Sequence, residues 1–312
     1  MKTLSIVTCS MNRTEHLIRC VQAASECSIH IEHIIIDWSS HEPVRADQLP
    51  TDNRIRLLRV EGEKYWVSSR AYNFGWSFST GSHVLKLDAD QLVTEDFFYT
   101  NDWVQDVLLA SDPNVGDNFI KTATGTFFVP LAYLRLVGGC NEYLDEKGWG
   151  YEDLDLFARL RGVCSQQPLD VGGLSSIEHS DLERVKYSDT NNLIPTDIQK
   201  SCLHSRNHWL ARTLIWNTSI KVSTYREEDG RWRADYVPRL PDYFAKKEAV
   251  VARKLAIDEV LGIRLDPLNQ SNIFAVYHLI MQQSLVRLFR AISLVPRLYA
   301  RIINIMLRVV IH

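Results

Sequence analysis

Two aspartates, Asp88 and Asp90, directly follow the short apolar run 84–87. The run is long enough for one buried strand, and in an extended backbone the side chains of residues i and i+2 lie on the same side. Carboxylates that converge on one point repel each other, and a divalent cation with oxygen ligands commonly relieves this repulsion. The pair therefore predicts a metal site at the end of a strand. The alternative is an ordinary turn in which both aspartates are solvated or cap the backbone.

A second acidic group, Glu152, Asp153 and Asp155, follows the segment 148–151, which has the sequence Gly-Trp-Gly-Tyr. Glycines allow the backbone to approach a ligand closely, and the indole has a flat apolar face on which a sugar ring can stack. The acids open a predicted helix that stops at Gly162, so they lie where the helix dipole favours anions. The alternative is that these acids only cap the helix.

Strand-like and helix-like runs alternate through the first part of the chain. The strand-like runs are 3–8, 33–36, 54–60 and 84–87, and the helix-like runs are 14–21 and 68–79. This alternation predicts crossover units and an α/β fold with a mostly parallel central sheet that helices cover on both faces. In such sheets ligands bind beyond the carboxyl ends of the strands. Polar residues gather at that edge in the segments 8–13, 37–40 and 88–90, which favours a site over three unrelated turns.

The chain has 312 residues, of which 46% are hydrophobic and 23% charged, as in an ordinary globular protein. Its six cysteines are scattered without metal-type spacing, which favours reduced thiols in the cytosol. The first residues enter a strand directly, without a signal-peptide core. The sequence also contains no apolar run of about 20 residues, the length that a membrane-spanning helix needs. These observations predict a cytoplasmic protein.

Residues 272–312 differ from the rest, because they contain five arginines and no Asp, Glu or Lys. Since the whole chain has a net charge of −3, residues 1–271 carry −8, which argues against a nucleic-acid binder. On a helical wheel the arginines fall within roughly 80°, and the other residues are mostly apolar. A basic amphipathic helix of this kind predicts attachment of 273–312 to an anionic membrane surface, on its cytoplasmic face. The alternative is packing on the domain or on the second subunit of a homodimer.

Four motifs within residues 3–95 resemble the donor half of family 2 glycosyltransferases, which have the GT-A fold. They are the run 5–8, the strand that ends in Asp37, the segment 69–75 and the metal motif 87–90, in this order. The resemblance implies a GT-A-type α/β fold and a nucleotide-sugar donor, with Asp90 on the metal and Asp88 near both metal and ribose. Trp38 departs from the family, whose members more often have a small or acidic residue there. The implied donor-binding residues are Thr8, Ser10, Arg13, Asp37, Arg70, Asn73 and Asp88; for Arg70 and Asn73 a solvated helix face is the alternative.

Segment 148–155 is similar to the Gly-Trp-Gly-Gly-Glu-Asp segment of the β-1,4-galactosyltransferases and the polypeptide N-acetylgalactosaminyltransferases. The resemblance implies that Asp153 is the catalytic base, with Glu152 beside it. Because Tyr151 replaces the second glycine and Leu154 replaces an acid, the identity of the acceptor does not carry over. The implied acceptor-binding residues are Trp149, Gly150, Tyr151 and Asp155.

Segment 175–180 resembles the galactosyltransferase segment whose histidine completes the metal shell. It implies His179 as a metal ligand beside Asp90 and Asp88, although a lone histidine is more often a surface or core residue. The family's methionine ligand would fall at Ser176 and is absent. Carboxylate, imidazole and pyrophosphate ligands suit Mn²⁺ or Mg²⁺ rather than a structural zinc.

The sequence thus predicts a metal-dependent, inverting glycosyltransferase that uses a UDP-sugar of the galactose, N-acetylgalactosamine or N-acetylglucosamine type. The acceptor would be a carbohydrate in glycan or polysaccharide synthesis. One alternative is a nucleotidyltransferase, although no Gly-rich, Lys-containing loop follows the first strand. The other is a non-catalytic, membrane-associated scaffold that holds a nucleotide sugar.

We expect a catalytic domain at 1–185, with a donor half at 1–95 and an acceptor half at 96–185. An accessory segment at 186–271 would pack on or extend the acceptor side. It contains Asp229-Gly230, which predicts the turn of a β-hairpin, and a helix-like run at 245–261. The basic tail 272–312 forms a C-terminal helical extension.

Overall fold

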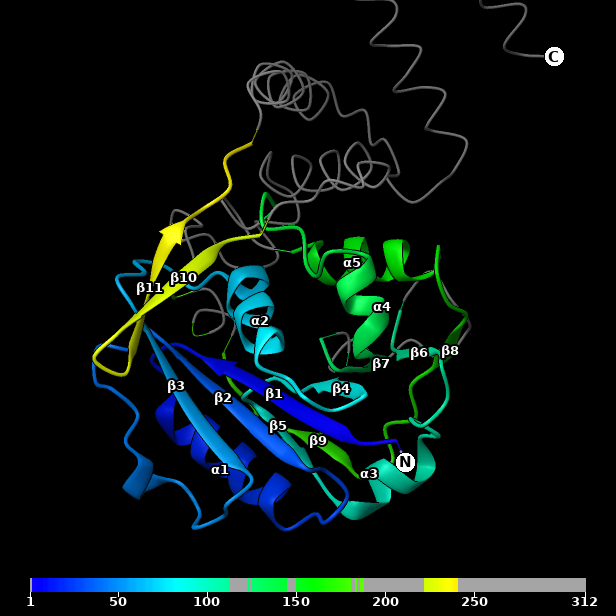
Figure 1. Ribbon diagram of the computed structural model, residues 1–312. Coiled ribbons are helices and arrows are strands. Elements are labelled where there is room, and N and C mark those ends of the chain that lie inside the picture. Colours follow the sequence, from blue (N-terminus) through cyan, green and yellow to red (C-terminus); the bar gives the residue numbers. More distant parts are fainter. Residues whose placement is uncertain are drawn as a thin grey trace, which may run out of the picture. The chain divides into compact units, whose positions relative to one another are not determined.

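The computed structural model describes residues 2–112, 123, 125–144, 150–180, 183, 186–187 and 222–240. They form an α/β unit in which helices cover both faces of a central sheet (Figure 1). The predicted α/β class with a mostly parallel sheet is confirmed. The tail and the helix expected at 245–261 lie outside the described residues, so the membrane and homodimer hypotheses stay predictions. None of the described helices has the length and apolar character needed to cross a membrane.

Four parallel strands form the centre of the sheet, in the order β3-β2-β1-β4. All seven residues of β1 are buried, because helices cover it on both sides. Its nearly continuous apolar sequence is typical of such a strand. These strands and the helices that connect them are β1 (Leu4–Ser10), α1 (Thr14–Ser25), β2 (Glu32–Trp38), β3 (Ile55–Glu61), α2 (Ser68–Ser77) and β4 (His83–Lys86).

Successive residues of β1 face different helices. Val7 packs in one cluster with Ala71 of α2, whereas Ile6 packs in another with Cys20 of α1. Helix α2 lies so close to the sheet that a Cβ on Gly75 would stand 2.6 Å from Val7 Cγ1. The glycine therefore permits the approach of the helix that carries Tyr72 toward the end of β1.

The second half of the sheet is mixed. β7 (Phe127–Pro130) pairs antiparallel with β4. β6 (Leu108–Ala110) pairs with β7, and β8 (Gln166–Pro168) forms the edge. The helices of this half are α3 (Glu95–Thr100), α4 (Leu131–Leu136) and α5 (Glu152–Leu160).

A separate two-stranded sheet brings distant segments to the end of β4. β5 (Gln91–Val93) pairs antiparallel with β9 (Leu174–Ser176), with Gln91 opposite Ser176. Immediately after this pair, the backbone N–H of Ile177 donates to the carbonyl of Asp90 at 2.7 Å. The residues that follow β9 therefore lie beside the residues that follow β4.

The hairpin predicted around Asp229-Gly230 is present as β10 (Thr224–Glu228) and β11 (Arg231–Tyr236). Its two turn residues have φ values of 52° and 74°, a combination that glycine and aspartate tolerate. β11 also pairs in parallel with β3, and the ring of Trp232 packs against that of Phe74 on α2. This part of the accessory segment therefore extends the central sheet at its β3 edge.

Two buried histidines lie at the opposite end of the central strands from the carboxyl edge. His33 is fully buried on β2, with Nε2 3.0 Å from the Thr8 hydroxyl, and its ring stands edge-on to that of His30. Burial lowers the pKa of His33 to about 3 and that of His30 to about 4; the charge of Arg54 lowers both pKa values further, and that of Asp52 opposes the shift. Both histidines are therefore neutral in the folded protein at neutral pH.

This burial predicts an acid-sensitive fold. Below their unfolded pKa of about 6.5 the histidines gain protons only on unfolding, so stability is complete above that pH and falls toward pH 4. Each histidine should contribute a slope of about 1.4 kcal/mol per pH unit. Urea unfolding of wild type and His33→Gln at pH 7, 6, 5 and 4 measures the slope, which should be smaller in the variant. Parallel curves would show that His33 does not contribute.

Candidate active site

A pocket of about 480 Å³ lies at the carboxyl end of β1 and beyond the end of β4. This is the edge at which ligands bind in open α/β sheets. The wall is built from β1 and the turn after it, α2, the residues around β4 and β5, the start of α5, and the residues after β9. The predicted site residues that line it are Ser10, Arg13, Asp88, Asp90, Glu152, Asp153 and His179.

The two aspartates of the metal motif have different partners. Asp88 Oδ1 accepts hydrogen bonds from Lys86 Nζ at 2.9 Å and from the Tyr72 hydroxyl at 2.8 Å. Burial raises the pKa of Asp88, but the charge of Lys86 and these hydrogen bonds outweigh it, so the pKa lies below its ordinary value. Asp88 is therefore held as an anion by the protein itself.

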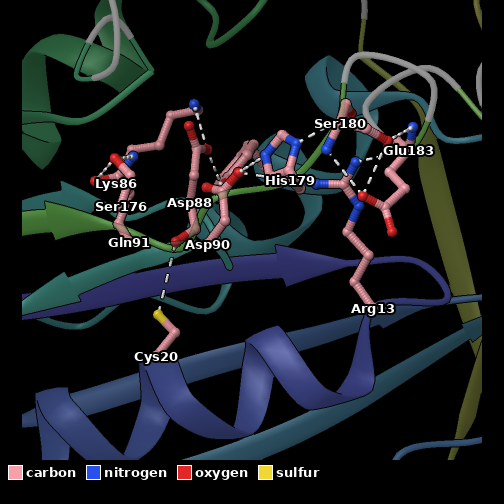
Figure 2. Close-up of polar contacts among 11 residues, drawn as sticks. Arg13, Cys20, Lys86, Asp88, Asp90, Gln91, Ser176, His179, Ser180 and Glu183 are labelled. Atoms are coloured by element: carbon pink, nitrogen blue, oxygen red, sulfur yellow. Dashed lines mark hydrogen bonds and ion pairs between the residues drawn. The ribbon is translucent and has the colours of Figure 1, made fainter.

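Asp90 faces His179, with 2.5 Å between its Oδ2 and the histidine Nε2 (Figure 2). The other ring nitrogen of His179 lies 3.4 Å from the carbonyl of Ser180. A proton on that nitrogen leaves Nε2 with a lone pair, and a lone pair so close to a carboxylate needs either a cation that both atoms bind or a proton between them. The Arg13 guanidinium is 3.8 Å from the same Asp90 oxygen and supplies part of the positive charge.

The donor set of Asp90 and His179 fits a divalent cation such as Mn²⁺, which accepts both carboxylate and imidazole ligands. Within the described residues no three His, Cys, Asp or Glu side chains are grouped so that they could hold a metal by themselves. The remaining ligands would therefore come from water or from phosphate oxygens, as is usual for sites built on one or two carboxylates.

The acids of α5 reach the pocket from its other wall. Tyr151 precedes the helix in a left-handed conformation, with a φ of 75°, which turns the chain sharply into the first helical turn. Glu152 Oε1 accepts a hydrogen bond from the Ser68 hydroxyl at 3.2 Å, and Asp153 Oδ1 lies 3.5 Å from Lys86 Nζ. The first turn of a helix favours anions, so both carboxylates are stabilised where they stand.

The charges that line the pocket do not balance. Its walls carry five acidic side chains and two permanently charged cations, Arg13 and Lys86. An anionic ligand would be repelled by this surface unless a further cation entered with it. The acids are Asp88, Asp90, Glu152, Asp153 and Glu178.

Several predicted site residues do not line the pocket, and Asp37 is the clearest example. Its side chain is fully buried and pairs with Arg59 at 2.5 Å. It also accepts hydrogen bonds from the backbone N–H groups of Ser40 and Val44, each at 3.0 Å. The carboxylate therefore holds the loop that follows β2. The other predicted residues outside the lining are Thr8, Arg70, Asn73, Gly150, Tyr151 and Asp155, and Trp149 lies outside the described residues.

Asn73 belongs to a cluster of buried polar contacts that includes the segment before α5. Its amide donates to the Cys140 carbonyl and to Glu142 Oε1, both at 2.9 Å, and its oxygen accepts from the Cys140 N–H at 2.7 Å. A Cβ on Gly139 would collide with this amide, so the close contact requires glycine there. Arg70, one helical turn away, pairs with Glu63.

Asp155 has a similar role within α5. It pairs with Arg159 at 2.6 Å, and that guanidinium also donates to the carbonyls of Val137 and Gly139, both at 2.7 Å. Burial raises the pKa of Asp155, which the charge of Arg159 opposes. The pair therefore attaches the helix to the turn after α4, and the carboxylate is not part of the pocket.

Sequence reasoning did not identify Lys86, Tyr72 or the Gln91–Ser176 pair as parts of the site. Gln91 and Ser176 hydrogen-bond through their side chains at 3.0 Å and keep β5 and β9 together at the pocket wall. Lys86 carried a usable signal. It is the one charge in an apolar strand, and it stands two residues before Asp88, hence on the same face.

Similarity to solved structures extends over most of the chain. A Drosophila β-1,4-galactosyltransferase 7 mutant in complex with manganese, UDP-Gal and xylobiose shares 13% sequence identity, with a TM-score of 0.48 over 80% of this chain and 99% of that chain. The catalytic domain of Drosophila β-1,4-galactosyltransferase 7 with xylobiose shares 12%, with a TM-score of 0.45 over 80% and 99%. S. aureus TarS 1-349 shares 12%, with a TM-score of 0.46 over 70% and 67%. No protein-family model and no curated protein matches the chain.

The contacts of Asp37 predict a mainly structural role. Asp37→Asn should lower the free energy of unfolding by about 3 kcal/mol or more, because it removes one partner of a buried ion pair. Asp47→Asn is the matched control, since the side chain of Asp47 is 73% exposed; it should change stability by less than about 0.5 kcal/mol. Urea unfolding measures both. A stable Asp37→Asn protein that binds nucleotide poorly would favour the donor-binding role instead.

Proposed function

We propose that the protein is a metal-dependent, inverting glycosyltransferase that moves a sugar from a UDP-sugar to a carbohydrate acceptor. The observation that carries the proposal is that one pocket holds both a carboxylate–imidazole pair, Asp90 and His179, and a separate anchored carboxylate, Asp153. The first pair is suited to a cation and its diphosphate, and the second to a proton transfer. Galactose, N-acetylgalactosamine and N-acetylglucosamine donors are the candidates.

The excess of acids supports the dependence on a metal. A UDP-sugar brings a diphosphate into a pocket whose permanent cations are outnumbered by carboxylates. Asp90 and His179 would hold Mn²⁺ or Mg²⁺, which supplies positive charge for the departing diphosphate. Arg13, beside Asp90, adds a fixed cation. Ser10 also belongs to the pocket wall, and its hydroxyl has no hydrogen-bond partner among the described residues.

Asp153 would act as the base of the transfer. It accepts the proton of an acceptor hydroxyl while that oxygen forms a bond to the anomeric carbon of the sugar. The bond from this carbon to the diphosphate breaks at the same time, on the opposite face of the ring, and UDP leaves with the bonding electrons. One such displacement inverts the anomeric configuration.

A turnover assay distinguishes an enzyme from a non-catalytic protein that only holds a nucleotide sugar. Incubation of the purified protein with Mn²⁺ and a panel of UDP-sugars should release UDP slowly from the donor that fits, even without an acceptor. Binding of UDP without hydrolysis or transfer of any donor would favour the scaffold. The same panel identifies the sugar.

Removal of either metal-binding side chain should weaken binding of the cation and of UDP with it. Asp90→Ala and His179→Ala are each expected to lower the affinity for Mn²⁺ plus UDP by about 100-fold or more, since loss of even an indirect contact to a metal costs about 10- to 100-fold. Isothermal titration calorimetry measures this without any turnover. Asp96→Ala, at an exposed position of α3, is the control and should bind normally. Unchanged affinity in both site variants would remove the metal from the proposal.

The proposed base predicts a loss of rate without a loss of binding. Asp153→Asn should keep its affinity for UDP and Mn²⁺ and lower transfer by about 100-fold or more, as expected when a general base is removed. Leu154→Ala changes the next residue without touching a carboxylate, and should alter only stability or acceptor affinity. If Asp153→Asn transfers sugar at the normal rate, Glu152 becomes the next candidate for the base.

A further inference from the structure

Lys86 is a buried cation at the centre of the pocket wall. The side chain of Lys86 is 5% exposed, and the residue lies in strand β4 between apolar neighbours. Lysine is almost never buried to this extent unless its charge is paired. Here the partners are two carboxylates from distant segments, Asp88 after β4 and Asp153 on α5.

The position of the ammonium group is determined without Asp153. Nζ donates to Asp88 Oδ1 at 2.9 Å and to the Gly125 carbonyl at 2.5 Å, and it lies 4.4 Å from the centroid of the Tyr72 ring. Gly125 has no room for a side chain, because a Cβ would stand 2.1 Å from Asp88 Oδ2 and 3.0 Å from Lys86 Nζ. The lysine is thus held by strand, loop and helix together.

An ammonium group has three N–H donors. Two of them are used by Asp88 and Gly125, and the positive charge of the group also attracts Asp153, whose Oδ1 is 3.5 Å from Nζ. One carboxylate oxygen of Asp153 is thereby turned toward the protein.

We propose that Lys86 is the positioning residue for Asp153, and that its fixed ammonium group orients this carboxylate toward the acceptor hydroxyl. The inference rests on the proposed function, because it needs Asp153 to be the base. It adds that the strand carrying the metal motif also sets the geometry of the proton transfer. The inference implies that the start of α5 does not by itself hold the Asp153 carboxylate in the productive orientation.

The charge of Lys86 is secure. Burial by itself lowers the pKa of this lysine, but the carboxylates of Asp153 and Asp88 raise it well above its ordinary value. The ammonium form therefore persists across the pH range in which an enzyme is assayed.

A double-mutant cycle tests the inference in the full-length protein. Lys86→Met, Asp153→Asn and the double variant are compared with wild type for transfer from the UDP-sugar that the wild type uses. Lys86→Met should lower kcat by about 10- to 100-fold, the cost of a misplaced catalytic group. Its affinity for UDP and Mn²⁺ should change far less, because Asp90 and His179 contact each other rather than Lys86. In the Asp153→Asn background the same substitution should cost nothing further.

Lys2→Met is the matched control, because Lys2 forms an exposed ion pair with Asp106 and does not line the pocket; it should transfer at the wild-type rate. If circular dichroism shows that Lys86→Met does not fold, Lys86→Arg takes its place in the cycle. It keeps the charge but presents a longer, planar group, so it should lower kcat only where Asp153 is present.

The possible results separate the inference from the proposed function. Normal transfer by Lys86→Met, or a loss of equal size in both backgrounds, overturns the role of Lys86 and leaves the glycosyltransferase proposal standing. A wild-type protein that neither transfers nor hydrolyses any UDP-sugar overturns both. A loss of kcat on Lys86→Met that disappears in the Asp153→Asn background supports the inference. If Lys86 were purely structural, its substitution would lower kcat in that background too.

Discussion

Repulsion among carboxylates gathered at one edge of the sheet is the constraint on which the site depends. Asp88 and Asp90 follow β4 and Asp153 lies on α5, and each carboxylate would be destabilised by the other two. Two cations reduce this repulsion: Lys86 lies between Asp88 and Asp153, and Arg13 lies beside Asp90. This compensation is incomplete, since acids still outnumber cations on the pocket wall. The remaining negative charge supports the proposal that the pocket binds a divalent cation.

The small sheet of β5 and β9 fixes the position of Asp90 relative to His179. Its register places Gln91 opposite Ser176, and the chain on either side then brings Asp90 and His179 together. The two residues are far apart in sequence, and no local preference of either segment produces their contact. A pairing of only three residues on each strand thus determines whether the pair that suits a metal exists at all.

The buried polar residues outside the pocket show that a side chain can bind a ligand only if its hydrogen bonds and charge are not already paired within the protein. Asp37, Asn73 and Asp155 are the residue types that bind ligands, but each is paired within the protein: Asp37 and Asp155 with an arginine, and Asn73 with the backbone of Cys140 and the side chain of Glu142. A buried carboxylate or amide must be paired to be stable, and one that is paired within the protein has little capacity left for a substrate. These residues support the site by holding the loop after β2 and the segments on both sides of α4.

The order of strands and helices at the start of the chain followed from periodicity and spacing, which is why the α/β class and the parallel centre of the sheet could be predicted. The places where Asp88, Asp90 and Asp153 would stand also followed, because strand ends and helix starts are local signals. The partners of these residues could not be predicted. Lys86 was visible as one charge in an apolar strand, but only packing against α5 shows that it meets Asp153. Asp37 ends a strand at the ligand-binding edge just as Asp88 follows one, and the tertiary structure alone turned the first toward Arg59 and the second toward the pocket. The sequence determined which groups reach that edge, and long-range packing decided which of them line the pocket.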